Sequence, residues 1–249
     1  MESRQEIILT AIIKEYVDSA VPVGSSLIFE KYNLNVSSAT IRAEMVELEN
    51  SGYLYQPYTS AGRIPTDKGF RYFVDELMKD KKLTQKEQNS LQVEVLKLKA
   101  QNRMLARTTA KLLSEMSDNL AVSGLIGSND FQKAGLQRLF SKPEFQNSDS
   151  VCRVAEVLDY IDESIDVLSK ELKNKSEVEV YIGKENPFCA VDECSMVVSK
   201  YSLENGEEGF LAIIGPKRMK YSRNVSLIDY LKNLLSGSGM VVLVYVAIL

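Results

Sequence analysis

Histidine is absent from the 249 residues of the sequence, which removes the commonest general base and a frequent metal ligand. A Ser-His-Asp or Cys-His mechanism and a histidine-ligated zinc site are therefore excluded. The three cysteines, Cys152, Cys189 and Cys194, are too few for a disulfide framework, and the last two lack the spacing of a common zinc site. We therefore expect no metal, no cofactor and no enzymatic activity.

Long apolar runs are absent as well. The longest, residues 240–249, is far shorter than the roughly 20 residues that cross a bilayer, and the chain opens on an amphipathic pattern rather than a signal peptide. A positive net charge is also missing, because 34 acidic residues outnumber 30 basic ones. We expect a cytoplasmic protein without membrane contact, and any binding to nucleic acid must be argued from local charge.

The first 80 residues contain the pattern of three short helices followed by a hairpin. Apolar spacing predicts helices over residues 4–20 and 25–31, and a third helix that Ser37 caps and that ends near residue 50, before Gly52. Residues 53–55 and 63–65 bracket a polar loop, and a fourth helix begins at Thr66 or Asp67. This order is typical of a winged helix-turn-helix, although a small helical domain with a surface hairpin gives the same pattern.

In a helix-turn-helix, the start of the second helix enters the major groove of DNA. Here that start carries Ser37, Ser38 and Thr40, which are small enough for close approach, and Arg42, which could clamp guanine or a phosphate. Ser37 could equally serve as a helix cap alone. The hairpin loop and the fourth helix add the candidates Tyr58, Thr59, Ser60, Arg63, Lys68 and Arg71. Because this patch carries little positive charge, one chain alone should bind DNA with modest affinity. Tight binding to an operator would therefore need a dimer.

Residues 81–120 lack glycine and proline and predict one long helix. Leucine recurs every seventh residue, at heptad position d, and a single asparagine, Asn102, stands at position a, which favours a parallel two-stranded coiled coil. A helix packed on its own domain is the alternative, supported by Thr109 at position a and by the apolar Leu96 and Leu113 outside the seam. The residues expected to dimerise are Leu91, Val95, Leu98, Asn102, Leu105, Leu112 and Met116.

The remaining residues, 121–249, mix helical and strand patterns. Strands are predicted over 120–126, 177–182, 195–201, 210–214 and 241–249, and helices over 131–141, 151–172 and 226–235. Elements in this order predict an α+β domain with an antiparallel sheet.

Several separate segments closely resemble the heat-inducible transcription repressor family HrcA. They are residues 22–25, 36–42, 48–54 and 59–71, then 135–139 with 142–145, 181–186 and 214–221. The resemblance implies a homodimeric repressor that binds double-stranded operator DNA, at the inverted repeat called CIRCE, upstream of the groE and dnaK chaperone operons. It also implies a winged helix, a GAF-like domain, an inserted dimerising domain and modulation by the chaperonin GroEL.

The sequence departs from the family pattern in two places. Tyr58 stands where the family usually has histidine in the wing, and about a dozen residues join 120–122 to 135–137 where the family carries a long stretch. We therefore expect a winged helix-turn-helix over 1–80, a long helix over 81–120 that supplies the dimer contact, and a truncated GAF-like α+β domain over 121–249. A small-molecule-sensing winged-helix regulator of other genes is the alternative function, and a protein-interaction module is a third.

Overall fold

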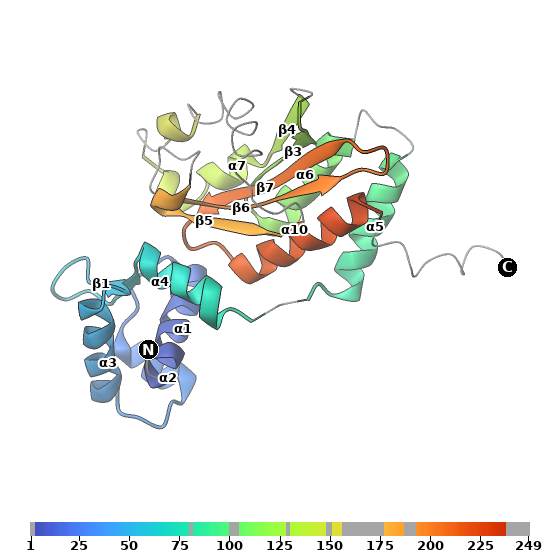
Figure 1. Cartoon of the computed structure of the whole chain (residues 1–249). Coiled ribbons are helices and arrows are strands. Elements are labelled where there is room, and N and C mark those ends of the chain that lie inside the picture. The colour runs from blue at the N-terminus through green and yellow to red at the C-terminus, as the bar shows by residue number, and fades with distance from the viewer. Residues whose placement is uncertain are drawn as a thin grey trace. The chain divides into compact units, whose positions relative to one another are not determined.

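The computed structural model of the chain describes residues 3–79, 82–99, 105–127, 130–147, 151–155, 177–186 and 193–237 (Figure 1). By internal contacts the chain divides into two compact units. Unit 1 is Met1–Lys79 with Lys217–Lys220, and unit 2 is Asp80–Pro216 with Tyr221–Leu249. The segment 81–120, which the sequence predicted as a separate helical part, falls within unit 2.

Unit 1 begins with three helices: α1 (Ser3–Ser19), α2 (Ser25–Tyr32) and α3 (Ser38–Asn50). The Oγ atom of Ser37 accepts a hydrogen bond from the backbone N–H of Thr40 at 3.1 Å, so the predicted cap is confirmed. The apolar stripes of the three helices meet in one core. Its fully or almost fully buried members include Ile8, Leu9, Ile12, Ile28, Ile41, Met45 and Leu48.

A two-stranded antiparallel hairpin follows α3. Strand β1 (Leu54–Tyr55) pairs with β2 (Ile64–Pro65), and residues 56–63 form the loop between them. Helix α4 (Asp67–Tyr72) is capped by Thr66, whose Oγ1 accepts from the N–H of Gly69 at 3.1 Å, and it continues into the π-helical turn η1 (Phe73–Leu77). Phe70 of α4 is buried, which closes the core on this side.

Unit 2 is built on a five-stranded antiparallel sheet with the strand order β4-β3-β7-β6-β5. Its strands are β3 (Leu120–Leu125), β4 (Asp130–Ala134), β5 (Glu179–Ile182), β6 (Cys194–Ser202) and β7 (Glu208–Pro216). The predicted α+β class and antiparallel sheet are therefore confirmed. Residues 156–176 and 241–249, which hold most of one predicted helix and all of the last predicted strand, lie outside the described residues.

One prediction in this unit is wrong. Residues 131–141 were expected to form a single helix, but Asp130–Ala134 is strand β4, and only Leu136–Phe140 is helical (α7). Gly135 stands between them with φ +90°, and a Cβ atom there would lie 1.9 Å from the Oγ of Ser114. This left-handed residue cannot continue a helix, because α-helical residues have φ near −63°.

Helices cover the sheet on one side, and a second apolar core lies on the other. Helices α10 (Tyr221–Leu235) and α6 (Leu105–Ser117) pack on the strands, and α5 (Gln85–Lys99) packs on both of these helices (Figure 1). The opposite core combines sheet residues with α7 and with the short 3-10 helix η3 (Pro143–Phe145). Its members include Leu120, Val122, Leu139, Phe145, Met196, Val198 and Phe210.

For residues 81–120 this packing favours the alternative that the sequence left open, a helix packed on its own domain, over the dimeric coiled coil. Because α5 and α6 contact each other and α10, they do not form one straight helix. Leu91 and Val95 are fully buried within the single chain, and Leu105 is 7% exposed, so these seam residues belong to the core of unit 2. Leu112 and Met116 are partly buried, while Asn102 and the side chain of Leu98 lie outside the described part of the structure.

Candidate nucleic-acid interface

A cleft of about 210 Å³ lies in unit 1 between the starts of α2 and α3 and the hairpin loop. Four of the predicted DNA-binding residues line it: Arg42, Thr59, Ser60 and Arg63. The full lining is Val23, Gly24, Ser25, Ser26, Arg42, Met45, Gln56, Thr59, Ser60, Ala61, Gly62 and Arg63. Sequence reasoning missed Ser25 and Ser26, although a pair of hydroxyl residues at a predicted helix start was visible.

Arg42 is exposed in the second turn of α3. Within the described residues, no ion pair or hydrogen bond engages its guanidinium. Its neighbours Ile41 and Met45 are buried, which fixes the helix so that Arg42 lies on the outer face. The guanidinium is therefore free to bind an anion at the edge of the cleft.

The hydroxyl groups at the start of α3 have local partners. Ser37 caps the helix, and its Oγ also lies 2.9 Å from the Oγ1 of Thr40. Ser38 donates to the Oγ of Ser25 at 3.3 Å, which links the first turn of α3 to the first turn of α2. Ser37 thus has the capping role that the sequence left open, and it remains exposed.

The hairpin loop is held in shape by Gln56. The side-chain amide of Gln56 donates to the carbonyl oxygens of Thr59 at 2.9 Å and Ala61 at 2.8 Å, and the N–H of Ala61 donates to the carbonyl of Tyr58 at 2.8 Å. These bonds leave Thr59 and Ser60 exposed and Tyr58 65% exposed. The side chains predicted for the wing are therefore presented to solvent by an ordered backbone.

Arg63, one of the predicted DNA-binding residues, is engaged within unit 1. Its Nε atom lies 2.9 Å from the Oε2 of Glu49 on α3, and its side chain is only 13% exposed. The other carboxylate oxygen of Glu49 accepts from the backbone N–H of Gln56 at 3.1 Å. Glu49 therefore fixes both ends of the hairpin loop to α3, and the structure gives Arg63 an anchoring contact.

The segment before α2 is joined to the same loop. Val23 and Arg63 form an isolated antiparallel bridge, with N–H to carbonyl distances of 2.9 and 2.8 Å. A Cβ atom on Gly62 would lie 2.4 Å from the carbonyl carbon of Val23, so only glycine allows this approach. Two sequence segments that carried the family resemblance, 22–25 and 59–71, therefore meet at the cleft.

The last two predicted residues lie elsewhere. Lys68 donates from Nζ to the carbonyl oxygen of Ser51 at 2.8 Å, and its ammonium lies 4.4 Å from the centre of the Tyr53 ring. Arg71 pairs with Asp75 at 3.2 Å. Because Ser51 follows the C-terminal end of α3, Lys68 lies about 20 Å from the helix start at 1.5 Å per residue. Neither residue lines the cleft.

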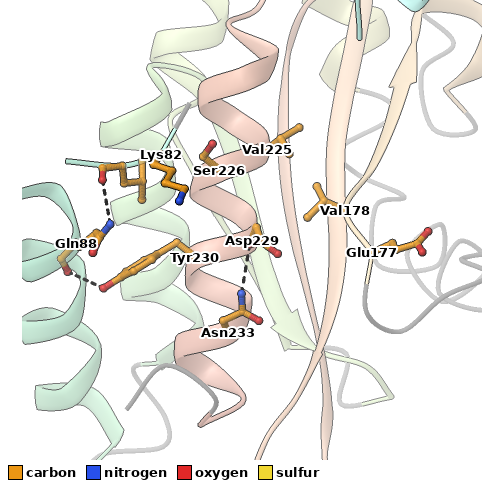
Figure 2. Close-up of a pocket in the computed structure, with 10 residues that line it drawn as sticks. Lys82, Gln88, Glu177, Val178, Val225, Ser226, Asp229, Tyr230 and Asn233 are labelled. Carbon is orange, nitrogen blue, oxygen red and sulfur yellow. Dashed lines mark hydrogen bonds between the residues drawn. The ribbon is translucent and has the colours of Figure 1, made fainter. Parts of the chain in front are cut away.

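A larger pocket of about 700 Å³ lies in unit 2 beside α5, α10 and the start of β5 (Figure 2). Its polar groups bind one another: Tyr230 donates to the carbonyl of Gln88 at 3.2 Å, and Asn233 donates to Asp229 at 3.3 Å. Burial raises the pKa of Tyr230. No cluster of metal-ligating side chains occurs among the described residues. Its charged lining residues are one cation, Lys82, and two anions, Glu177 and Asp229.

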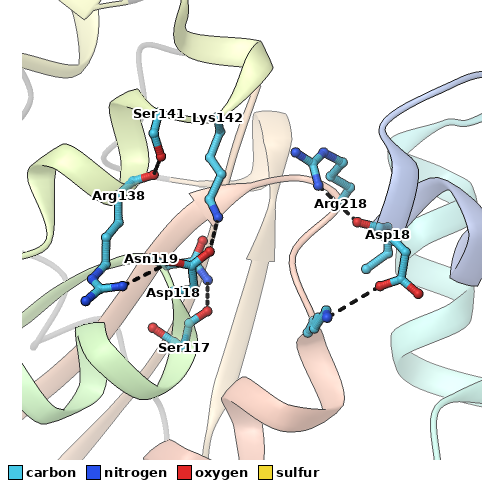
Figure 3. A network of polar contacts seen from close by, with 10 residues as sticks. Asp18, Ser117, Asp118, Asn119, Arg138, Ser141, Lys142 and Arg218 are labelled. Carbon is cyan, nitrogen blue, oxygen red and sulfur yellow. Dashed lines mark hydrogen bonds and ion pairs between the residues drawn. The ribbon is translucent and has the colours of Figure 1, made fainter.

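A polar network fixes residues 135–145 to the end of α6 (Figure 3). Asp118 pairs with Lys142, and with Arg138 at 3.2 Å. The hydrogen bond from Lys142, followed by its charge and that of Arg138, holds the pKa of Asp118 below its usual value. The buried side chain of Asn119 donates to the carbonyl of Ser117 at 2.7 Å. This network connects α7 and η3 to α6, and its role is therefore structural.

A family model described as HrcA protein C terminal domain matches residues 68–225 of this chain. The chain belongs to the HrcA family. The "Heat-inducible transcription repressor HrcA" of Ruminiclostridium cellulolyticum is 28% identical over 333 aligned positions, which cover 94% of this chain and 96% of the relative. The protein of the same name from Acetivibrio thermocellus is 29% identical over 94% of this chain and 95% of its own length.

The alignment with the R. cellulolyticum HrcA runs over more positions than the 249 residues present here, so that relative contains residues without a counterpart in this chain. A solved structure titled "Crystal structure of a hypothetical protein at 2.2 A resolution" shares the fold, with a TM-score of 0.73 at 21% identity over 96% of this chain and 98% of that one. Among the described residues, no helix is both long and apolar enough to span a membrane.

Proposed function

We propose that this member of the HrcA family is a heat-inducible transcription repressor, with unit 1 acting as a winged helix-turn-helix. Its target is the inverted-repeat CIRCE operator of the groE and dnaK chaperone operons. The observation that carries the proposal is the cleft in which Arg42 of α3 faces Thr59 and Ser60 of the hairpin loop. In this assignment α3 is the recognition helix and residues 56–63 are the wing.

The outer face of α3 has the composition that a recognition helix needs. Ser37, Ala39, Arg42 and Ala43 are exposed in its first turns, whereas Ile41, Met45 and Leu48 are buried. Small side chains let a helix enter the major groove, and an arginine can contact guanine through two hydrogen bonds. The face therefore combines close approach to the bases with one cation that can contact either guanine or a backbone phosphate.

The acidic residues of α3 are largely neutralised within unit 1. Glu44 pairs with Arg4 at 3.3 Å and accepts from Gln5 at 3.2 Å, and Glu49 pairs with Arg63. Repulsion between these two carboxylates and DNA phosphates is therefore reduced. At physiological ionic strength the Debye length is about 8 Å, so charges further than this from the duplex are largely screened. A chain with a net negative charge can therefore bind DNA through the residues nearest the duplex.

An inverted-repeat operator requires two copies of unit 1 related by a two-fold axis, so we propose that the repressor acts as a homodimer. Since Leu91, Val95 and Leu105 are buried within one chain, this dimer uses another surface. GroEL would act on the chain as it acts on other incompletely folded clients, by restoring the competent fold. Heat then releases repression when the chaperonin is occupied elsewhere.

Binding to the operator tests the proposal directly. Fluorescence anisotropy should give tight binding to a duplex from the host groE promoter and at least about 1000-fold weaker binding to a scrambled duplex. The affinity should fall linearly with log salt concentration, because phosphate contacts release counterions. Equal affinity for both duplexes would contradict the proposed function. Footprinting with and without GroEL then tests the chaperonin.

A further inference from the structure

We infer that the cleft between α2, α3 and the hairpin loop seats one phosphate group of the DNA backbone, held by Arg42 together with Ser25 and Ser26. This inference rests on the proposed function and names the part of the duplex that occupies the cleft. Ser25 and Ser26 belong to the first turn of α2, and Arg42 belongs to the second turn of α3. The phosphate would touch both helices and the wing at once.

The composition of the cleft selects an anion. Its lining contains two arginines and the hydroxyl groups of Ser25, Ser26, Thr59 and Ser60, and no aspartate or glutamate lines it. This contrasts with the whole chain, in which acidic residues outnumber basic ones. Hydroxyl and guanidinium groups donate hydrogen bonds to phosphate oxygens, and a charged acceptor makes these bonds stronger.

The two arginines contribute unequally to this cleft. The charge of Arg63 is opposed by Glu49 at 2.9 Å, whereas the guanidinium of Arg42 has no partner among the described residues. The net positive charge at the cleft therefore comes from Arg42. Arg63 forms part of the wall and holds the loop that carries Thr59 and Ser60.

The start of α2 leaves its side of the cleft open. Gly24 is the N-cap residue of α2, and it has no side chain to bond the first N–H groups of the helix. A Cβ atom added to Gly24 would meet no atom within 4 Å. The volume of about 210 Å³ is several times the roughly 30 Å³ of one liquid water, which is enough for a phosphate and bridging water.

Gly24 also supplies a sharp test. Its backbone has φ −89° and ψ 154°, which any residue adopts, so Gly24→Asp is compatible with the fold. The new carboxylate would cap α2 and thus leave thermal stability unchanged or raised, because aspartate is a better N-cap than glycine. The same carboxylate would repel a phosphate from the cleft. Asn33→Asp, at the other end of α2, is the matched control for charge.

The experiment measures the affinity of the full chain for the groE operator duplex and for duplexes in which single phosphates are replaced by neutral methylphosphonate. For the wild type, one position in each half-site should lower the affinity by about tenfold. Gly24→Asp and Arg42→Gln should each bind the unmodified duplex about tenfold more weakly and lose sensitivity at that position. In Arg42→Gln the slope of log affinity against log salt should fall by about 1 per half-site.

Three outcomes separate the proposals. The phosphate site is supported if Asn33→Asp binds like the wild type while Gly24→Asp and Arg42→Gln bind more weakly and lose sensitivity to the methylphosphonate. A folded Gly24→Asp or Arg42→Gln with wild-type affinity and an unchanged methylphosphonate profile overturns it, while operator binding by the wild type still upholds the proposed function. A wild-type chain that binds no duplex overturns both. Because Arg42 is exposed, Arg42→Gln keeps the test decisive even if Gly24→Asp fails to fold.

Discussion

The Nε atom of Arg63 lies 2.9 Å from the Oε2 atom of Glu49, and this ion pair ties the hairpin loop to α3. The pair is largely shielded, since the side chains are 13% and 31% exposed. Glu49 holds the loop a second time through the N–H of Gln56. The carboxylate of a residue on the proposed recognition helix therefore sets the position of the wing.

Glu49→Gln should weaken operator binding by roughly three- to fivefold, because a partly buried ion pair contributes about 1 kcal/mol and the wing would be less firmly held. The salt dependence should stay as in the wild type, since no phosphate contact is removed. Anisotropy at several salt concentrations measures both quantities. Glu47→Gln, at an exposed position on the same helix, is the control. A change in salt slope in Glu49→Gln would show that Arg63 itself contacts phosphate.

Gly62→Ala should destabilise unit 1 by about 1–3 kcal/mol, because the new methyl group would overlap the backbone of Val23. Operator affinity should fall with it. Thermal unfolding followed by circular dichroism measures the loss. Gly24→Ala adds the same methyl group where no atom lies within 4 Å, so it should lower the melting temperature less, by the preference for glycine over alanine at an N-cap alone. Equal melting temperatures for the two variants would argue against the close approach of Gly62 and Val23.

Leu91→Ala should lower the free energy of unfolding by about 2–5 kcal/mol, as expected for a fully buried leucine. Val93→Ala, on the same helix with 48% of its side chain exposed, should cost less than about 0.5 kcal/mol. Urea denaturation gives these values, and sedimentation equilibrium gives the mass. A Leu91→Ala chain that keeps its stability but changes from dimer to monomer would restore the coiled-coil interpretation.

Acid should destabilise unit 2 through Glu87. Hydrogen bonds from Thr84, followed by the charge of Arg223, whose Nη1 lies 2.7 Å away, hold the pKa of Glu87 below its usual value. A carboxylate with a lowered pKa in the folded state stabilises the protein above its unfolded pKa of about 4.3, and that contribution is lost as the pH falls through the folded pKa. Urea midpoints from pH 7 to pH 3 should therefore fall less steeply for Glu87→Gln. Parallel curves would contradict this role.

Tyr58→Phe tests whether the hydroxyl group at the tip of the wing binds DNA. The side chain is 65% exposed, so removing the hydroxyl should not affect stability. Loss of one hydrogen bond to a phosphate should weaken binding to operator and scrambled duplexes alike, by roughly three- to tenfold. Tyr55→Phe, at the base of the hairpin and 45% exposed, serves as the comparison. Unchanged affinity in Tyr58→Phe would remove Tyr58 from the interface.

The helices of unit 1 could be predicted from the sequence because local chemistry specifies their ends. Ser37 and Thr66 each accept a hydrogen bond from an N–H three residues later, and Gly52, the second residue after α3, adopts φ +77°. These signals act within a few residues, so no knowledge of tertiary contacts is needed.

Other features depend on contacts between distant residues. Strand β4 forms because residues 130–134 pair with β3, which outweighs their helical pattern. The leucines at every seventh residue could pack on a partner chain or on the chain's own α6 and α10. A coiled coil repeats every 3.5 residues and an ordinary packed helix every 3.6, and four repeats are too few to distinguish the two periods. Likewise, the count of cations near the wing could not reveal that Glu49 engages Arg63.

The bridge between Val23 and Arg63, the close approach of Gly62 to Val23, and the hydrogen bond and ion pair of Glu49 hold the hairpin loop rigidly against the helices of unit 1. A signal that ends repression therefore has no loose loop to unfasten inside this unit. Under the proposed function, such a signal would change the number of competent chains or the spacing of the two DNA-binding units in a dimer, and each unit would keep its internal geometry.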